Sequence, residues 1–539
     1  MTMDVIEADV VIVGAGVAGA LTAYRLARSG VKVVVLESGP WLDRATAVQR
    51  FLDSPIKTPD APYPPLAHAP RPTVLSLRDG HYVQDGPATF GSTYERCVGG
   101  TTWHWQGTTL RFLPNDFRMK TRYGVGQDWP FGYDELEPWY LEAERELGVA
   151  GDAGDDLGSP RSGPYPQPPI PPTYLDRQVD AALRPLGLRT QVSPHARNST
   201  FFQDRPPCCG NNTCVPICPI GAKYDAAVHA RLAQAAGATI VDQAVAFRID
   251  VDDDDHITAI AFKRPDGSEH LARGRRFVLA AHAIETPRLL LMSQSARCPD
   301  GVANRSGAVG RNLMDHPAQV SLALARDPVY PYRGPVEVSG IEHRRDGDFR
   351  AHTAASRTPI GNDGWSFGGH NLIGLAGQFI DDGLRGLALH DALKHAGQRQ
   401  VRLASLIEQL PDANNRVRLS EQVDALGLPR PRITYAYDGY VQRGVAEARL
   451  LADKVFEGLG ATQRVHVDTL FGAGHIMGTL RMGTDPASSV VDPFGRSHDH
   501  PNLWMIGSGL FPTGATANPT LTLAAMALRT ADAMARDAD

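Results

Sequence analysis

The sequence predicts an α/β protein in which a domain built on a parallel sheet is joined to a second domain with an antiparallel sheet. Three observations predict this fold. Residues 8–13 form an apolar run that leads into a glycine-rich turn and a helical pattern, residues 244–281 alternate as strands do, and residues 326–465 are patterned less regularly. With 539 residues, the chain is long enough for two domains with substantial cores.

The apolar run is the first part of a nucleotide-binding pattern. It is followed by the turn Gly14–Gly19, a helix to about residue 29, and a second strand at residues 31–36 that ends in Glu37. This strand–turn–helix–strand context of Gly-x-Gly-x-x-Gly predicts a Rossmann-like dinucleotide-binding domain. Gly14 and Gly16 let a pyrophosphate approach the helix N-terminus, and Gly19 lets the helix pack on the strand. Glu37 is expected to accept hydrogen bonds from the adenosine ribose, with a solvated strand end as the alternative.

Further along the chain, three strands are expected at Ala244–Val251, His256–Arg264 and Arg275–Ala281. They would form a meander inserted in the dinucleotide-binding domain. The proline-rich stretch at residues 164–172 is typical of an extended linker between subregions.

Composition and charge exclude several classes of function. A net charge of −6 gives no reason to expect a nucleic-acid partner. No apolar run approaches the length of a membrane-spanning helix, so contact with a membrane would come only through partners. The first residues are acidic and lead directly into a strand, so we expect no export signal on this chain, which would stay cytoplasmic on its own.

Four of the six cysteines lie within eleven residues, in a stretch that also holds several prolines. A stiff loop with converging thiols is typical of an iron–sulfur cluster, and Cys-Pro is a familiar end of a cluster motif. Cys208, Cys214 and Cys218 are separated by five and three residues, while Cys209 is expected to point away from its neighbour. We therefore expect these three cysteines to be the ligands of a 3Fe-4S cluster. The alternative is that Cys209 is a fourth ligand, which would allow a cubane cluster.

Other interpretations of the cysteine run fit its spacing less well. Adjacent cysteines rarely pair with each other, and the chain is not a small disulfide scaffold. Zinc prefers Cys-x-x-Cys pairs, which are absent from the run. The isolated Cys97 and Cys298 are expected to be buried thiols.

Several motifs in a fixed order resemble a known family. They are the Gly-Gly-Thr-Thr run within residues 98–105, the pattern at 283–291, the Asp-His-Pro turn within 312–317 and the C-terminal block from His475 to Thr522. Together they resemble the glucose–methanol–choline (GMC) oxidoreductases, which bind FAD. The cysteine run is similar to that of the catalytic subunits of bacterial membrane-linked glucose, fructose, sorbitol and gluconate dehydrogenases and of glucoside 3-dehydrogenases.

The resemblance implies a GMC fold with an FAD-binding domain made of residues 1–125, 226–325 and 466–539. Residues 126–225 would form a linker and iron–sulfur loop region, and residues 326–465 the substrate domain. Besides Gly14, Gly16, Gly19 and Glu37, the resemblance implies further residues that contact FAD. They are Gly100, Thr101, Thr102, His104, Trp105, Ala281, Gly507, Ser508, Asn518, Pro519 and Thr520.

The resemblance makes His475 the catalytic base and Asn518 its partner, 43 residues later. Oxidation of an alcohol removes a proton from oxygen while hydride leaves carbon, and imidazole titrates near neutrality, so it can accept that proton. Asn518 can hydrogen-bond the same oxygen without competing for the proton. His316 is expected to cap its turn, with a direct flavin contact as the alternative. His498 and His500 are expected to be structural.

The residues next to the catalytic histidine depart from the family pattern. Ala473 and Gly474 stand where the glucose and fructose enzymes carry Asn-Asn, and Met477 stands in place of their threonine. We therefore expect different contacts beside the substrate. Trp365 and Phe367 are candidates for the sugar pocket, with core packing as the alternative.

His104 carries a separate hypothesis. The Gly-Gly-Thr-Thr-Trp-His-Trp run is similar to the loop on which pyranose oxidases attach FAD covalently through histidine. The offset from the double glycine falls on His104. The alternative is that His104 hydrogen-bonds or packs near the flavin between Trp103 and Trp105.

The two cofactors together predict a dehydrogenase. A cluster accepts one electron at a time and would serve no purpose in an enzyme that passes both electrons to oxygen. The expected activity is oxidation of a sugar or polyol hydroxyl, with electrons leaving through the cluster to a cytochrome c or quinone. An FAD sugar oxidase of the pyranose oxidase type and a non-catalytic flavin and iron–sulfur relay are the alternatives.

The resemblance also implies partners and a location. The partners are a small subunit with a twin-arginine export signal and a multi-haem cytochrome c subunit. The small subunit would carry the folded chain to the periplasmic face of the inner membrane.

Overall fold

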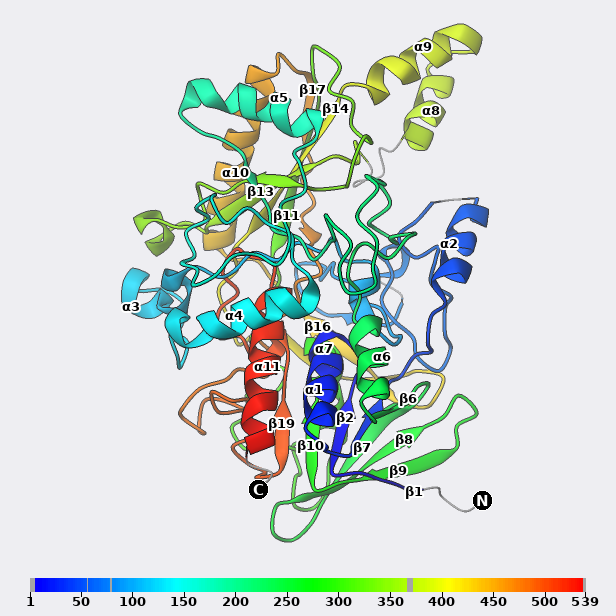
Figure 1. Ribbon diagram of the computed structural model, residues 1–539, viewed down its shortest axis with the longest axis vertical. Helices are drawn as coiled ribbons and strands as arrows, with labels where there is room; N and C mark the ends of the chain where they lie inside the picture. Colours follow the sequence, from blue (N-terminus) through cyan, green and yellow to red (C-terminus); the bar gives the residue numbers. More distant parts are fainter. Residues whose placement is uncertain (1–4, 56, 78–79, 366–371, 537–539) are drawn as a thin grey trace.

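The computed structural model describes residues 5–55, 57–77, 80–365 and 372–536. A five-stranded parallel sheet lies at the centre of its lower half (Figure 1). The strand order is β19-β10-β2-β3-β6, and each neighbouring pair is parallel. The bounds are β2 Val10–Val13, β3 Val33–Leu36, β6 Thr239–Val241, β10 Arg276–Leu279 and β19 Leu503–Met505.

The apolar strands of this sheet are covered by helices. Every residue of β2 and β3 is buried, which is why both read as continuous apolar runs rather than as alternating strands. Helix α1 packs against α6 and α11, and α11 packs against α4. The bounds are α1 Val17–Arg28, α4 Tyr133–Leu147, α6 Ala227–Ala235 and α11 Thr520–Arg536.

A four-stranded sheet, β1-β9-β8-β7, lies beside the parallel sheet and corrects one prediction. Its bounds are β1 Val5–Glu7, β7 Val245–Val251, β8 Ile257–Lys263 and β9 Glu269–Arg273. The strand expected at Arg275–Ala281 is present as β10 Arg276–Leu279, but its assignment to the meander is wrong, because the third strand of the meander is β9. That segment is β10, whose last three residues are fully buried, and it joins the parallel sheet between β2 and β19.

The upper half of the molecule contains an antiparallel sheet in the order β17-β11-β14-β13-β12-β5, with β18 paired to β11 (Figure 1). Helix α10 packs against β11 and β14, and also against α5. The α/β class with an antiparallel second sheet is therefore confirmed. The bounds are β5 Gln191–Val192, β11 Pro317–Leu324, β12 Ser339–Ile341, β13 Ser356–Gly361, β14 Gln400–Ile407, β17 Thr462–His466, β18 Phe471–Gly472, α5 Tyr174–Leu183 and α10 Gly439–Gly458.

The remaining elements lie around these sheets. A three-stranded sheet has the order β15-β16-β4, and α8 and α9 pack on each other as a helical hairpin at the upper right of Figure 1. The bounds are β4 Val83–Gln84, β15 Arg416–Val423, β16 Pro429–Thr434, α2 Arg44–Asp53, α3 Met119–Tyr123, α7 His282–Met292, α8 Leu372–Asp381 and α9 Gly386–Gly397. Across the described ranges, no helix combines the length and apolar character needed to span a bilayer.

Candidate active site

The glycine-rich turn between β2 and α1 has the close packing that its sequence predicts. Gly14 has a φ of +101°, and a Cβ there would lie 2.7 Å from the carbonyl oxygen of Ala280. A Cβ on Gly19 would lie 2.0 Å from the carbonyl oxygen of Gly14, so α1 can pack this closely only with glycine. At Gly16, by contrast, a Cβ would meet no described atom within 4 Å. Gly16 therefore leaves open space at the start of α1, where a ligand can approach the backbone.

Glu37 lies at the carboxyl end of β3, and its carboxylate spans the turn. Ala15 N donates to Oε2 at 2.9 Å, while Gly39 N donates to Oε1 at 3.0 Å. Burial raises the pKa of Glu37 above its ordinary value, and these backbone donors counteract that rise. Ser38 Oγ also donates to Oε1, at 3.1 Å. A carboxylate oxygen has two lone pairs, so among the described contacts Oε2, which accepts from Ala15 alone, keeps acceptor capacity for a ligand hydroxyl.

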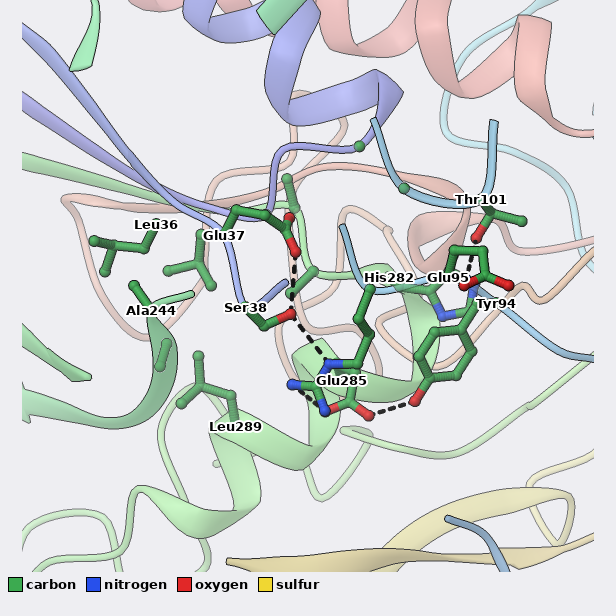
Figure 2. Close-up of a pocket in the computed structure, with 18 of the residues that line it drawn as sticks. Leu36, Glu37, Ser38, Tyr94, Glu95, Thr101, Ala244, His282, Glu285 and Leu289 are labelled. Carbon is green, nitrogen blue, oxygen red and sulfur yellow. Dashed lines mark hydrogen bonds and ion pairs between the residues drawn. The ribbon is translucent and has the colours of Figure 1, made fainter. Parts of the chain in front are cut away.

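The glycine-rich turn and Glu37 line one cavity (Figure 2). Six of the residues that the sequence pointed to line it: Gly14, Gly16, Glu37, Gly100, Thr101 and Ala281. Figure 2 shows a chain of polar contacts running from Glu37 through Ser38 to Glu285 and Tyr94. Arg96 links Ser38 to Glu285, donating to Ser38 Oγ at 3.1 Å and lying 3.8 Å from Glu285 Oε2.

Sequence reasoning missed this polar side of the cavity. Tyr94, Arg96 and Glu285 come from two segments far apart in the chain, and no motif marks them as a group. Nearby arginines and the hydrogen bond from His81 hold the pKa of Glu285 well below its ordinary value despite the opposing effect of burial. Glu285 is therefore a negative charge in the wall of the cavity, and the nearby arginines balance it.

The expected flavin loop docks on the glycine-rich turn. Gly99 N donates to Ala15 O at 3.0 Å, and a Cβ on Gly100 would lie 3.3 Å from the Cα of Gly16. Thr102 and Trp105 serve the loop itself. Thr102 Oγ1 accepts from Ala226 N at 2.8 Å, and Trp105 Nε1 donates to Tyr224 O at 2.7 Å. Neither side chain is among those that line the cavity of Figure 2.

His104 lies at the end of this loop. Its Nδ1 is 3.3 Å from Oε1 of Glu95, and its ring meets that of Tyr63 edge-on at 6.1 Å between centroids. Glu95 lines the cavity, whereas His104 is not among the residues that line it.

His475 and Asn518, which the family resemblance pairs, lie next to each other. The Nε2 atom of His475 lies 3.0 Å from Nδ2 of Asn518. Burial, together with His316 and Arg357 nearby, lowers the pKa of His475 well below its ordinary value. A neutral imidazole with an unshared electron pair is the form that can accept a proton.

His316 contacts His475 directly. The two Nδ1 atoms lie 2.8 Å apart, and His316 Nε2 lies 2.9 Å from the carbonyl oxygen of Ala515. The sequence predicts that His316 caps its own turn, but both of its ring nitrogens contact residues of the C-terminal block. The imidazoles of His316 and His475 are arranged edge-on, with centroids 5.0 Å apart.

Asp315, beside His316, ties the Asp-His-Pro turn to the loop of His475. Its Oδ1 accepts from the backbone N–H groups of His316 at 2.7 Å and His475 at 3.0 Å, and Ser92 Oγ donates to Oδ2. Burial raises the pKa of Asp315 to about 6. The family pattern marked this turn, but nothing in the sequence indicated that it holds His475.

Arg357 is a further residue that sequence reasoning missed. It lies on β13, is fully buried, and donates through Nη1 to Oδ1 of Asn518 at 3.0 Å. Its guanidinium also contacts Glu342 and Glu337 at 3.0 and 3.2 Å. An arginine on a central strand carries no sequence signal that would distinguish it from an ordinary buried ion pair.

The C-terminal residues of the predicted set surround the same region. Gly507 has a φ of +122°, and Ser508 Oγ donates to Ile476 O at 2.6 Å, next to His475. Pro519 precedes α11, which begins at Thr520. His498 contacts Ser489 Oγ at 3.0 Å, and His500 Nδ1 lies 2.9 Å from the carbonyl oxygen of Asp255, which is far away in the chain. Trp365 is buried in a hydrophobic cluster, and Phe367 lies outside the described residues.

The three cysteines expected to bind a cluster occupy one loop. Burial raises the pKa of Cys208, and the neighbouring Cys214 and Cys218 add to the rise, so the three thiols lie within electrostatic reach. Cys209 is exposed. In the part of the chain that the structure describes, no group of three or more His, Cys, Asp or Glu side chains is arranged around a single metal ion.

Comparison with known proteins identifies the family. Residues 174–318 and 411–527 match family models described as GMC oxidoreductase, and residues 9–49 match one described as FAD dependent oxidoreductase. The chain is 39% identical over 554 residues to the fructose dehydrogenase large subunit of Gluconobacter japonicus, covering 100% of this chain and 99% of that protein. It is 31% identical over 550 residues to paromamine 6'-oxidase of Streptomyces fradiae, covering 98% and 91%.

Two further comparisons agree. The gluconate 2-dehydrogenase flavoprotein of Pantoea cypripedii is 23% identical over 618 residues, covering 98% of this chain and 93% of that protein. The crystal structure of pyridoxine 4-oxidase from Mesorbium loti has the same fold, with a TM-score of 0.66, 19% identity and coverage of 98% and 99%. The resemblance seen in the motifs is thereby confirmed. The chain belongs to the GMC oxidoreductase family and is an FAD-dependent enzyme that oxidises CH–OH donors.

Proposed function

We propose that this chain is the catalytic subunit of an FAD-dependent dehydrogenase that oxidises a hydroxyl of a sugar or polyol. The relatives include both dehydrogenases and oxidases, so the family by itself does not choose between the two. The observation that carries the choice is the cysteine loop. An enzyme that hands both electrons to oxygen needs no one-electron carrier.

The cavity of Figure 2 fits FAD. Gly16 leaves the start of α1 open for a pyrophosphate, and Glu37 keeps acceptor capacity for a ribose. Gly100 and Thr101 close the opposite wall. FAD, when bound, supplies the hydride acceptor for the reaction.

We assign the proton transfer to His475. Its neutral ring accepts the proton of the substrate hydroxyl, and Asn518 orients the same hydroxyl. Both side chains lie where the Asp-His-Pro turn before β11 meets the C-terminal block, and we place the substrate hydroxyl beside them.

The cysteine loop has surroundings that suit an anionic cluster. Arg205 Nε and Nη1 and Arg197 Nε are buried without a hydrogen-bond partner among the described residues. Arg197 acts electrostatically on Cys208, and Arg205 on Cys218. We assign Cys208, Cys214 and Cys218 as the ligands of a 3Fe-4S cluster, because Cys209 is exposed. A cluster binds its cysteines through different irons, so the ligands are more widely spread than those of a single ion.

Lys223 joins the cysteine loop to the flavin loop. Its Nζ donates to Cys214 O at 2.7 Å and to Trp103 O at 2.9 Å. The two proposed redox sites are therefore held together by one buried side chain, which supports electron transfer from flavin to cluster.

Partners and location follow from the relationship to a protein described as a large subunit. We propose a small subunit with a twin-arginine signal, a multi-haem cytochrome c subunit as electron acceptor, and a position at the periplasmic face of the inner membrane. Co-purification of the chain with both subunits, expressed together, tests this assignment.

An anaerobic absorption spectrum tests the central proposal. Flavin bands on a broad iron–sulfur shoulder, with the flavin bleached by one of glucose, fructose, sorbitol, gluconate or a glucoside, are the expected result. Flavin bands without the shoulder, bleached by sugar and quickly restored by air, would instead identify an oxidase of the pyranose oxidase type. Electron transfer that survives His475→Ala would identify a non-catalytic relay.

Acid precipitation separates the two roles proposed for His104. Flavin that stays with the precipitated protein, and is released from His104→Ala, is covalently attached. Flavin released from both proteins means that His104 only packs beside the cofactor.

A further inference from the structure

Four polar side chains form one hydrogen-bonded chain through the proposed base. Arg357 Nη1 lies 3.0 Å from Asn518 Oδ1, and Asn518 Nδ2 lies 3.0 Å from His475 Nε2. His475 Nδ1 lies 2.8 Å from His316 Nδ1. The chain ends at the carbonyl oxygen of Ala515, 2.9 Å from His316 Nε2. Each end of this chain has a fixed hydrogen-bonding character, so the direction of every bond can be derived.

At the arginine end of the chain, each hydrogen bond can run in one direction only. A guanidinium only donates, so Oδ1 of Asn518 accepts and its amide nitrogen faces His475. An amide nitrogen also only donates, so Nε2 of His475 must accept and carries no proton. A neutral imidazole has one proton, which therefore lies on Nδ1 of His475.

The carbonyl end gives the same answer independently. A backbone carbonyl only accepts, so Nε2 of His316 must donate to Ala515 O. The remaining nitrogen of a neutral His316 is then an acceptor, and it faces Nδ1 of His475. Nδ1 of His475 must therefore carry the proton. The two ends agree on the tautomer.

We propose that His316 and Arg357 are positioning residues that hold His475 in the tautomer whose electron pair lies on Nε2, facing Asn518. The inference deepens the proposed function and rests on His475 being its base. Nε2 is the atom that must receive the substrate proton. Its single electron pair accepts from the Asn518 amide before substrate binds, so the substrate hydroxyl must displace that N–H, which can then donate to the hydroxyl oxygen. A histidine held in the opposite tautomer would present an N–H at Nε2 instead. Loss of the correct tautomer is a costly defect wherever a histidine acts as base.

Arg357 is itself fixed before any substrate binds. Its guanidinium contacts Glu342 at 3.0 Å and Glu337 at 3.2 Å, and Nη2 donates to Ser193 Oγ at 3.1 Å. All of these side chains are buried. Arg357 on β13 of the antiparallel sheet thus orients Asn518, which belongs to the C-terminal block.

His316 has a second role when the base is used. After Nε2 of His475 takes the hydroxyl proton, Nδ1–H still donates to the electron pair of His316. The imidazolium is therefore stabilised by a neutral acceptor that was in place beforehand. Leucine at position 316 would remove the acceptor, whereas the side-chain oxygen of asparagine would keep one.

The tautomer can be measured without turnover. The holoenzyme labelled with ¹⁵N in histidine gives separate signals for protonated and unprotonated ring nitrogens, and subtraction of the His475→Gln spectrum assigns those of His475. The expected result is a protonated Nδ1 and an unprotonated Nε2, with the same pattern in H316N. In H316L only the Arg357–Asn518 end still specifies the tautomer, so the opposite tautomer should become detectable beside it. A protonated Nε2 in the wild-type protein would overturn the proposal.

Matched variants connect the tautomer to the rate. H316L should lose about 10²-fold in kcat, and H316N less than about tenfold, at equal FAD content. R357K should also lose about 10²-fold, because a lysine cannot contact Glu342 and Asn518 together. R345K is its control. Arg345 is buried and lies 3.7 Å from Glu342, but it donates to Thr516 rather than Asn518. Equal losses in H316L and H316N, or in R357K and R345K, would refute the assignment.

The measurements separate this inference from the proposed function. If the tautomer is as stated but His475→Ala keeps full turnover, the proposed base is wrong while the positioning stands. If Nε2 is protonated but His475→Ala is inactive, the base stands and the positioning fails.

Discussion

Gly100 of the flavin loop lies directly against Gly16 of the dinucleotide turn, so that a Cβ on Gly100 would be 3.3 Å from the Cα of Gly16. Two motifs separated by more than eighty residues therefore form one wall of the cavity. At this contact a side chain on Gly100 would crowd the backbone of Gly16. The close approach shapes the proposed FAD site as much as either motif does.

Gly100→Ala should therefore lower FAD binding. The added methyl group would push the flavin loop off Gly16, and the φ of +54° adds a cost of about 1–2 kcal/mol for any residue with a Cβ. FAD content of the purified protein and the FAD dissociation constant are the measurements. Gly30→Ala is the control, because Gly30 has a φ of +81° and open space around it. An equal loss of FAD in both variants would show that backbone strain, and not the contact with Gly16, lowers FAD binding.

Activity should fall on the acid side as Asp315 becomes protonated. The pKa of this buried carboxyl is raised to about 6, so the carboxylate that holds the backbone of His316 and His475 loses its charge below that pH. We expect kcat to decline about tenfold below pH 6. In Asp315→Asn, kcat should be lower at pH 8 but nearly constant between pH 5 and pH 7.

The effect of Asp315 on stability has the opposite sign. A carboxyl whose folded pKa is raised contributes stability in full below its ordinary value of 3.8, and this contribution is lost as the pH rises through about 6. Loss of activity on acidification is therefore not explained by unfolding at Asp315. An acid limb that persists unchanged in Asp315→Asn would assign it to another group.

Each of the three proposed cluster ligands should be required for iron binding. Cys208→Ser, Cys214→Ser and Cys218→Ser should each lose the cluster, whereas Cys209→Ser should keep it because its side chain is exposed. Iron content and the electron paramagnetic resonance signal of the oxidised protein are the measurements. Loss of iron in Cys209→Ser as well would point to four ligands.

Arg350 should be essential for stability, because it neutralises two buried carboxylates. It lies 2.8 Å from Asp116 and also pairs with Glu408, and all three side chains are buried. Arg350→Met leaves both carboxylates unpaired, which we expect to cost about 3–5 kcal/mol and to lower the thermal midpoint by several degrees. Arg326→Met removes an exposed pair with Asp327 and should change the midpoint little. Similar midpoints for both variants would contradict this expectation.

The local elements of the dinucleotide-binding unit were predictable because neighbouring residues specify them. The buried runs of β2 and β3, the glycines between them and the acid at Glu37 all act within one continuous segment. The order of motifs along the chain also led to the prediction that His475 and Asn518 act as a pair, and their side chains lie 3.0 Å apart. By contrast, β9 and β10 were confused because a short apolar run fits a meander or a parallel sheet equally well.

The sequence by itself determined the dinucleotide unit and the family, and it predicted the two residues of the proposed proton transfer and the three cysteines of the proposed cluster. Tertiary structure decided what surrounds them. His316 meets His475 across 159 residues, and Arg357 meets Asn518 across 161. Such contacts leave no periodicity or spacing in the sequence, since a buried histidine or arginine looks the same whichever partner it meets. Which nitrogen of His475 carries the proton is accordingly a property of the folded protein.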